Sequence, residues 1–265
     1  MSSSPVLLER SGQLAILVLD RPDRANVLDL PTSEALIDTI AQVANHVAQG
    51  SVRAVLVRAN GRQFCAGGDI TDFVAAQGRL AEFLDRHIPP LHHAIHTLAT
   101  LPVPVVSAVN GPIGGGGIGL ALAADIVIAA ESMKLRGGYS AIGLTPDAGG
   151  SWFLARRVGA ARAKEIFLTN QVLSARDCLA IGAVSRVVAD ADLQAQALTL
   201  AEALARSATA SLGRIKTLFD GVSRRSLKEQ LDLEHQCMVA SGLTADAAEG
   251  TLAFAEKRGP VFTGR

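Results

Sequence analysis

A chain of 265 residues, 49% of them hydrophobic, can bury a sizeable core as one large domain or one domain with a smaller appendage. Its 25 basic and 25 acidic residues cancel, which excludes the electrostatic footprint of a nucleic-acid-binding protein. Three widely spaced cysteines (Cys65, Cys178 and Cys237) and an N-terminus without the basic and apolar segments of a signal peptide predict reduced thiols in a cytoplasmic protein.

Apolar patterning predicts an α/β arrangement over the first two-thirds of the chain. Compact apolar runs bounded by turn residues indicate strands, and apolar residues at helical spacing indicate helices. The expected strands are 14–19, 54–57, 103–109, 126–129 and 184–188. The expected helices are 33–49, 151–158, 160–168, 174–181, 192–205, 212–219, 226–240 and 245–257. We place a boundary near residue 205, which gives a core of residues 1–205 and a C-terminal helical region of residues 206–265.

Residues 103–130 are almost all apolar or glycine, and such a stretch is long enough to span a bilayer. Pro104, Pro112, Asp125 and the glycines at 114–117 interrupt it. A strand, a glycine loop, a short helix and a second strand explain this pattern better than a membrane helix does. The sequence therefore predicts no membrane association.

Two glycine-rich segments follow expected strands. The segment 64–69, Phe-Cys-Ala-Gly-Gly-Asp, lets the backbone turn sharply and expose N–H groups, although a loop that ends in an aspartate helix cap fits it equally well. The segment 110–119 holds four consecutive glycines before a helix, where close ligand approach and developing negative charge are both favoured. It lacks the Gly-Lys-Ser/Thr ending of a P-loop and does not match the dinucleotide fingerprint. Together the two segments can direct two N–H groups at one oxygen.

These two loops, the motif Pro146-Asp-Ala-Gly-Gly150 and the C-terminal stretch 230–264 follow one another as in the crotonase, or enoyl-CoA hydratase/isomerase, superfamily. The chain resembles that family over nearly its whole length. The resemblance implies an α/β fold, a spiral of ββα units with a C-terminal helical region for trimer assembly, in a homotrimer or a dimer of trimers. It also implies an acyl-CoA thioester as substrate, and no cofactor or metal, because coenzyme A arrives as part of the substrate.

The resemblance also assigns roles by position. The backbone N–H groups of Ala66 and Gly116 match the oxyanion hole that stabilises a thioester enolate. Asp69 is expected to order its loop rather than to perform chemistry. The residues expected to contact the substrate are Arg24, Ala25, Val27, Ala66, Gly67, Gly68, Asp69, Ile70, Gly115 and Tyr139.

Hydratases of this superfamily carry two glutamates that position and activate water. Gly119 and Tyr139 stand at those positions here, and neither replaces a carboxylate. Asp147 is similar to the acid/base aspartate of Δ3,Δ2-enoyl-CoA isomerase-like members, and the segment 142–157 resembles the epoxyphenylacetyl-CoA isomerases. We therefore expect Asp147 to carry a proton between carbons of an unsaturated or ring-derived acyl chain. The alternative role for Asp147 is an N-cap of the following helix.

His92 and Asp147 also fall where 4-chlorobenzoyl-CoA dehalogenases keep a histidine base and an aspartate nucleophile. That resemblance implies attack by Asp147 on an aryl carbon, then hydrolysis by water that His92 activates. The C-terminal residues look more like the isomerases, so a dehalogenase or other hydrolytic acyl-CoA reaction is the second hypothesis. A non-catalytic acyl-CoA-binding protein is the third. His92 would otherwise be a partly buried helix residue that lines the acyl pocket with Tyr139, and His92 and His96 lack the carboxylate of a zinc motif.

Overall fold

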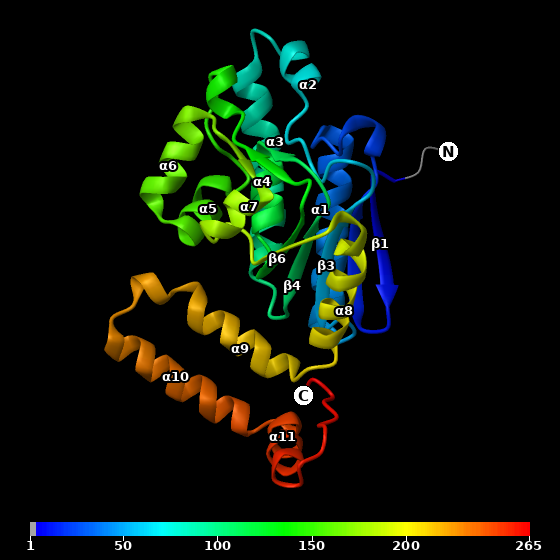
Figure 1. Cartoon of the computed structure of the whole chain (residues 1–265), viewed down its shortest axis with the longest axis vertical. Coiled ribbons are helices and arrows are strands. Elements are labelled where there is room, and N and C mark those ends of the chain that lie inside the picture. The colour runs from blue at the N-terminus through cyan, green and yellow to red at the C-terminus, as the bar shows by residue number, and fades with distance from the viewer. Residues whose placement is uncertain (1–3) are drawn as a thin grey trace.

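The computed structural model describes residues 4–265 and is built around a six-stranded sheet (Figure 1). The strand order is β1-β2-β3-β4-β6-β9, in which only β1 runs antiparallel to its neighbour. The strands are β1 (Val6–Ser11), β2 (Leu14–Leu19), β3 (Ala54–Ala59), β4 (Val105–Val109), β6 (Ile126–Ala130) and β9 (Arg186–Val188). All residues of β2 and β4 are buried, as expected of parallel strands covered on both faces.

A second, three-stranded sheet lies beside the first and consists of β5 (Ile113–Gly114), β7 (Lys134–Arg136) and β8 (Val172–Ser174). The helices up to the end of the sheet-containing part are α1 (Leu30–Ala48), α2 (Ile70–Ala75), α3 (Leu80–Ala99), α4 (Gly116–Leu122), α5 (Gly150–Val158), α6 (Ala160–Thr169), α7 (Ala175–Ala180) and α8 (Leu193–Ala205). The mixed α/β class that the sequence predicts is confirmed.

The large sheet has an apolar core on each face. One core joins the sheet to α1 and α3 through side chains such as Leu36, Ile40 and Leu98. The other joins it to α8, where Leu193 and Ala197 pack on residues of β2, β3 and β4. Side chains that leave alternate faces of a strand feed both cores. The sheet therefore holds the loops at the ends of β3 and β4 in fixed positions.

Helix α3 carries His92 and two internal prolines. It begins at Leu80 and contains Pro89 and Pro90, so the helix that carries His92 starts well before the two prolines. Leu91 and Ile95 are among its buried residues, and the helix packs on α1. His92 is among its exposed residues.

The C-terminal helices α9 (Thr209–Asp220), α10 (Leu227–Gly242) and α11 (Ala245–Ala255) extend away from the sheets (Figure 1). They carry large apolar side chains that are exposed, among them Met238 at 75% and Phe254 at 87%. The division of the chain near residue 205 falls between α8 and α9, and as a division into two regions it stays a prediction. Within residues 4–265, no helix has the length and apolar character to cross a membrane.

Candidate active site

The two glycine-rich loops meet at a cavity of about 600 Å³. Gly114 N–H donates to the Cys65 carbonyl at 3.0 Å, which ties the loops together. Gly67 has a φ of +89°, and a Cβ there would lie 2.7 Å from the Gly114 carbonyl oxygen. A side chain at this point would separate the loops, so glycine is required. The cavity is lined by Ala66, Gly68, Ile70, Phe73, Leu84, Ile88, His92, Gly114, Gly115, Gly116, Arg136, Gly137, Gly138, Tyr139, Ala141, Ile142, Leu144, Thr145, Pro146 and Asp147.

The N–H groups at this cavity differ from the pair that the sequence predicts. Ala66 N–H donates to the Ala25 carbonyl at 3.1 Å, so this group is already engaged and does not fit the expected oxyanion hole. Gly68 and Gly116 both line the cavity, and neither N–H has an acceptor among residues 4–265. Gly116 is the first residue of α4, where backbone N–H groups have no partner within the helix. Two free N–H groups therefore border the cavity.

Asp147 lies next to one of these groups. A Cβ built on Gly116 would be 3.4 Å from Asp147 Oδ1. The Tyr139 hydroxyl donates to the same oxygen at 2.5 Å. Burial, followed by the charge of Asp147, raises the pKa of Tyr139, so the phenol stays protonated and remains a donor. The structure thus holds one carboxylate oxygen beside the Gly116 backbone.

The alternative role of Asp147 as a helix cap is wrong. The residue at the N-cap of α5 is Gly149, in a left-handed conformation, and no side chain caps this helix. The Asp147 carbonyl accepts from Gly150 N–H at 2.8 Å, so it is the backbone of Asp147 that closes the turn. The carboxylate is left to face the cavity.

His92 contacts the backbone beside Asp147 and not its side chain. Its Nε2 accepts from Ala148 N–H at 2.9 Å, which requires this nitrogen to be unprotonated. Ala148 has a φ of 50° and Gly149 one of 76°, so the bond fixes a turn of two left-handed residues. The His92 side chain is exposed on α3 rather than partly buried, and it reaches the cavity wall from there.

Gly119, at the position where the family resemblance places a hydratase glutamate, lies against the same turn. A Cβ at Gly119 would be 1.9 Å from the Ala148 carbonyl oxygen and 2.6 Å from its carbon. No side chain fits at this distance. The backbone of α4 therefore packs directly on the Ala148 peptide, and this contact brings Asp147 towards Gly116.

The remaining residues predicted to contact the substrate separate into two groups. Ile70, Gly115 and Tyr139 line the cavity, and Asp69 lines an adjoining cavity of about 480 Å³ between α1 and α3. Arg24, Ala25, Val27 and Gly67 line neither.

Asp69 orders its loop, as expected. It accepts from Thr71 N–H at 2.8 Å at the start of α2, and it forms an ion pair with Arg24.

Sequence reasoning missed the apolar wall formed by Phe73, Leu84 and Ile88. Leu84 and Ile88 are four residues apart on α3, and this spacing was the available signal. Cys65 lies behind the cavity, where burial raises its pKa to about 12, so it is not an activated thiol. In the described part of the chain, no three histidine, cysteine or acidic residues come close enough to hold a metal ion.

Comparison with known proteins identifies the family. Residues 9–265 match the family model described as "Enoyl-CoA hydratase/isomerase". The chain is 39% identical over 253 residues to the 1,2-epoxyphenylacetyl-CoA isomerase of Escherichia coli K12, with 94% of each chain covered. It is 38% identical over 265 residues, the full length of both, to a Rhodobacter capsulatus protein named "Probable enoyl-CoA hydratase". The solved enoyl-CoA hydratase from Polaromonas sp. JS666 superposes with a TM-score of 0.90 at 33% identity, over 97% of this chain and 99% of that one. The fold is thus the crotonase fold that the resemblance implied, and the chain is an enzyme of the enoyl-CoA hydratase/isomerase family.

Proposed function

We propose that this enzyme isomerises an unsaturated or ring-derived acyl-CoA by moving a proton between carbons of the acyl group. The observation that carries the proposal is the position of Asp147. It is the single carboxylate among the described residues that line the 600 Å³ cavity, and its Oδ1 lies beside Gly116. One carboxylate is sufficient for isomerisation, because it can take a proton from one carbon and return it to another. Coenzyme A enters as part of the substrate, so the reaction requires no other cofactor.

In this mechanism the thioester oxygen binds between the N–H groups of Gly68 and Gly116. Gly68 replaces Ala66 in the proposed pair, because the Ala66 N–H is engaged by Ala25. When a proton leaves the acyl chain, negative charge develops on the thioester oxygen. Two fixed donors stabilise that charge without rearrangement, and removal of one such donor typically costs about a hundredfold or more in rate.

Asp147 then acts as the base and, once protonated, as the acid. It takes a proton from a carbon of the acyl group, which leaves an enolate, and it returns the proton to a different carbon when the enolate collapses. The Tyr139 hydroxyl holds Oδ1 throughout, so the second oxygen is free to reach the substrate. The apolar wall of Phe73, Leu84 and Ile88 limits the access of water that would exchange or divert the proton.

Hydration has less support, although relatives carry hydratase names. Gly119 has no side chain and no space for one, and the phenol of Tyr139 does not activate water as a carboxylate does. The hydrolytic hypothesis requires His92 to accept a proton from water. Its Nε2 already accepts from Ala148 N–H, so the geometry favours a positioning role for His92 over a base.

The test is conversion of a 3-enoyl-CoA to the conjugated 2-enoyl-CoA, followed by absorbance, for the wild type and Asp147→Asn. Loss of the base should lower kcat by about a hundredfold or more. Exchange of acyl protons with D₂O, followed by mass spectrometry, should fall in parallel. Asp85→Asn is the matched control, because Asp85 is exposed on α3 and lines none of the cavities.

Activity of Asp147→Asn within tenfold of the wild type would refute this role. If the wild type binds acyl-CoA but turns over no 3-enoyl-CoA, halogenated benzoyl-CoA is the next substrate. Absence of any turnover would leave the non-catalytic acyl-CoA-binding hypothesis.

The proposed function includes assembly into a homotrimer or a dimer of trimers through the C-terminal helices. The apolar side chains exposed on α10 and α11, such as Met238 and Phe254, support a buried interface there. Light scattering should give three or six times the chain mass of 27.5 kDa. A monomer would refute the proposed assembly and leave the proposed reaction intact.

A further inference from the structure

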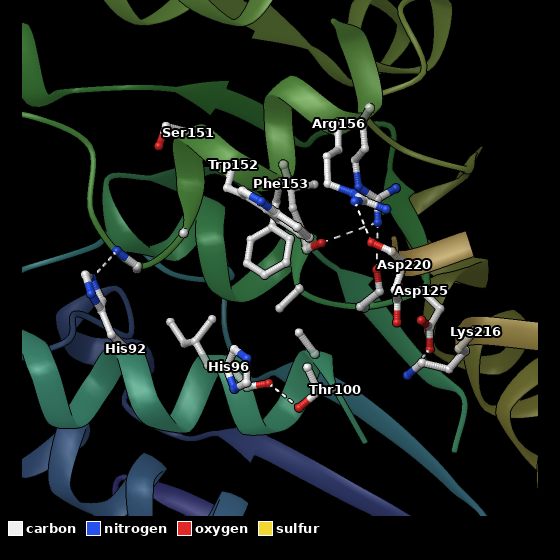
Figure 2. Close-up of a pocket in the computed structure, with 18 of the residues that line it drawn as sticks. His92, His96, Thr100, Asp125, Ser151, Trp152, Phe153, Arg156, Lys216 and Asp220 are labelled. Atoms are coloured by element: carbon white, nitrogen blue, oxygen red, sulfur yellow. Dashed lines mark hydrogen bonds and ion pairs between the residues drawn. The ribbon is translucent and has the colours of Figure 1, made fainter. Parts of the chain in front are cut away.

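Besides the substrate cavity and the adjoining cavity of about 480 Å³, the chain has a cavity of about 880 Å³ (the second cavity) between α3, α5 and the C-terminal helix α9. Figure 2 shows His92 at one end, Trp152 and Phe153 along the wall, and the Lys216–Asp125 ion pair at the other end. Its apolar lining includes Ile95, Trp152 and Phe153, Arg156 stacks on the Trp152 ring, and Asp125, Lys216 and Asp220 lie at the far end. A cavity of this kind suits an apolar chain or ring.

The second cavity adjoins the proposed substrate cavity. His92, Pro146 and Asp147 line both. Pro146 and Asp147 belong to the backbone segment that carries the proposed base, so they cannot move without moving that base. His92 is the one shared residue that approaches from a different element, helix α3.

The His92 ring is held in place at this boundary. Its Nε2 accepts from Ala148 N–H at 2.9 Å, and Ala148 lies in the fixed left-handed turn before α5. Helix α3 fixes the other end of the side chain, with Leu91 and Ile95 buried on either side of His92. The ring is therefore anchored at both ends, between a cavity that holds the proposed base and a larger cavity that contains no part of the proposed chemistry except Asp147.

We infer that His92 determines acyl-chain length: its ring closes the substrate cavity beside Asp147 and excludes the acyl group from the second cavity. The inference rests on the proposed function, since it places the acyl group beside Asp147. Removal of the ring joins the two cavities, and the distal part of a longer chain then enters between α3 and α5. Each methylene that is buried there in place of water improves binding by about fourfold.

The experiment compares kcat/KM for 3-dodecenoyl-CoA and 3-hexenoyl-CoA in three variants and the wild type. For His92→Ala, the dodecenoyl-to-hexenoyl ratio should rise on the order of tenfold or more above the wild-type ratio, since more than one methylene gains a buried site. His92→Phe keeps a ring but has no acceptor for Ala148 N–H, so its ratio should stay near the wild-type value. Both His92 variants lose the acceptor for Ala148 N–H. A decrease in kcat that is common to both therefore reflects a change in the Ala148–Gly149 turn and not in chain-length preference.

His96→Ala is the matched control. His96 lies one turn further along α3 and lines the second cavity but not the substrate cavity. Its ratio should equal that of the wild type, because the boundary at His92 is intact. An unchanged ratio in His92→Ala, or an equal rise in His92→Phe or His96→Ala, would overturn the inference.

Calorimetric binding of hexanoyl-CoA and dodecanoyl-CoA separates this inference from the proposed reaction, because it needs no turnover. Tighter binding of dodecanoyl-CoA by His92→Ala, relative to hexanoyl-CoA, supports the inference even if no isomerisation is found. Isomerisation of 3-hexenoyl-CoA by the wild type, with unchanged binding and rate ratios in His92→Ala, would overturn the inference and leave the proposed function standing.

Discussion

Replacing Gly119 with alanine tests whether the contact between α4 and the Ala148 peptide positions Asp147. The new Cβ would lie 1.9 Å from the Ala148 carbonyl oxygen, whereas ordinary contacts begin near 3.4 Å. The two backbones must therefore separate by about 1.5 Å, the difference between these distances. Residue 148 follows Asp147 directly, so the carboxylate moves with it.

Two effects should follow from this displacement. Overpacking of this kind typically costs about 1–3 kcal/mol of unfolding free energy. In a protein of this size, each kcal/mol lowers Tm by about 2–4 °C. A displacement of a catalytic group by about 1 Å costs on the order of a hundredfold in rate. The loss should appear in kcat for 3-enoyl-CoA isomerisation more than in the affinity for acyl-CoA, because Gly119 does not line the cavity that receives the substrate.

The assays are thermal unfolding and steady-state isomerisation, with Gly150→Ala as the matched control. Gly150 is the first residue of α5, which packs on α4. A Cβ built on Gly150 would have its nearest neighbouring atom 3.8 Å away, which is an ordinary contact. This variant should keep its activity and gain a little stability, since alanine is the better helix residue. Wild-type Tm and kcat in Gly119→Ala would refute the reasoning that this contact sets the position of Asp147.

Three further predictions concern other parts of the chain. Tyr139→Phe removes the donor to the proposed base and keeps the ring, so kcat should fall on the order of tenfold with little change in KM, and unchanged kcat would contradict the assigned contact. Hydrogen bonds from Arg258 lower the pKa of Glu249 from 4.5 to about 2, so the stability it contributes is present above pH 4.5 and is lost as the pH falls towards 2. The Tm difference between the wild type and Glu249→Gln should shrink over that range, and a constant difference would count against the pairing. Burial raises the pKa of Cys65 and Cys178 to about 12, so neither should react with a thiol reagent at pH 8 before unfolding, as mass spectrometry of the labelled peptides would check.

The parts of the fold that the sequence predicts well are those with long local patterns. The run at 14–19 coincides with β2. The expected helix 33–49 overlaps α1, which spans Leu30–Ala48. The helix starts earlier, at Leu30, because the Asp29 side chain accepts from Thr32 N–H and caps it. The strands of the small sheet escaped prediction because β5, β7 and β8 have two or three residues each. Their pairing depends on residues far apart in the chain, which no periodicity reports.

The candidate site was predictable as a set of loops but not as a set of hydrogen bonds. Gly116, Tyr139 and Asp147, which the family resemblance assigned to one site, line one cavity. The choice between Ala66 and Gly68 as a donor depends on a bond to Ala25, 41 residues away, and no local pattern contains it. The cap of α5 was equally hidden, because two consecutive left-handed residues place Gly149, and not Asp147, at the N-cap.

The lack of space for a side chain at position 119, where the family resemblance places a hydratase glutamate, and the position of Asp147 are consequences of one packing arrangement. The Ala148 carbonyl occupies the space that a side chain at position 119 would need, and the Ala148 N–H is held from the other side by His92. Both backbone groups of Ala148 are thus held, while Tyr139 fixes the Asp147 carboxylate. A glutamate at 119 would need the backbone of Ala148 to withdraw, and Asp147 would withdraw with it. The loss of one carboxylate therefore permits the approach of the other, and a change of Gly119 to glutamate should remove the proposed isomerase without creating a hydratase.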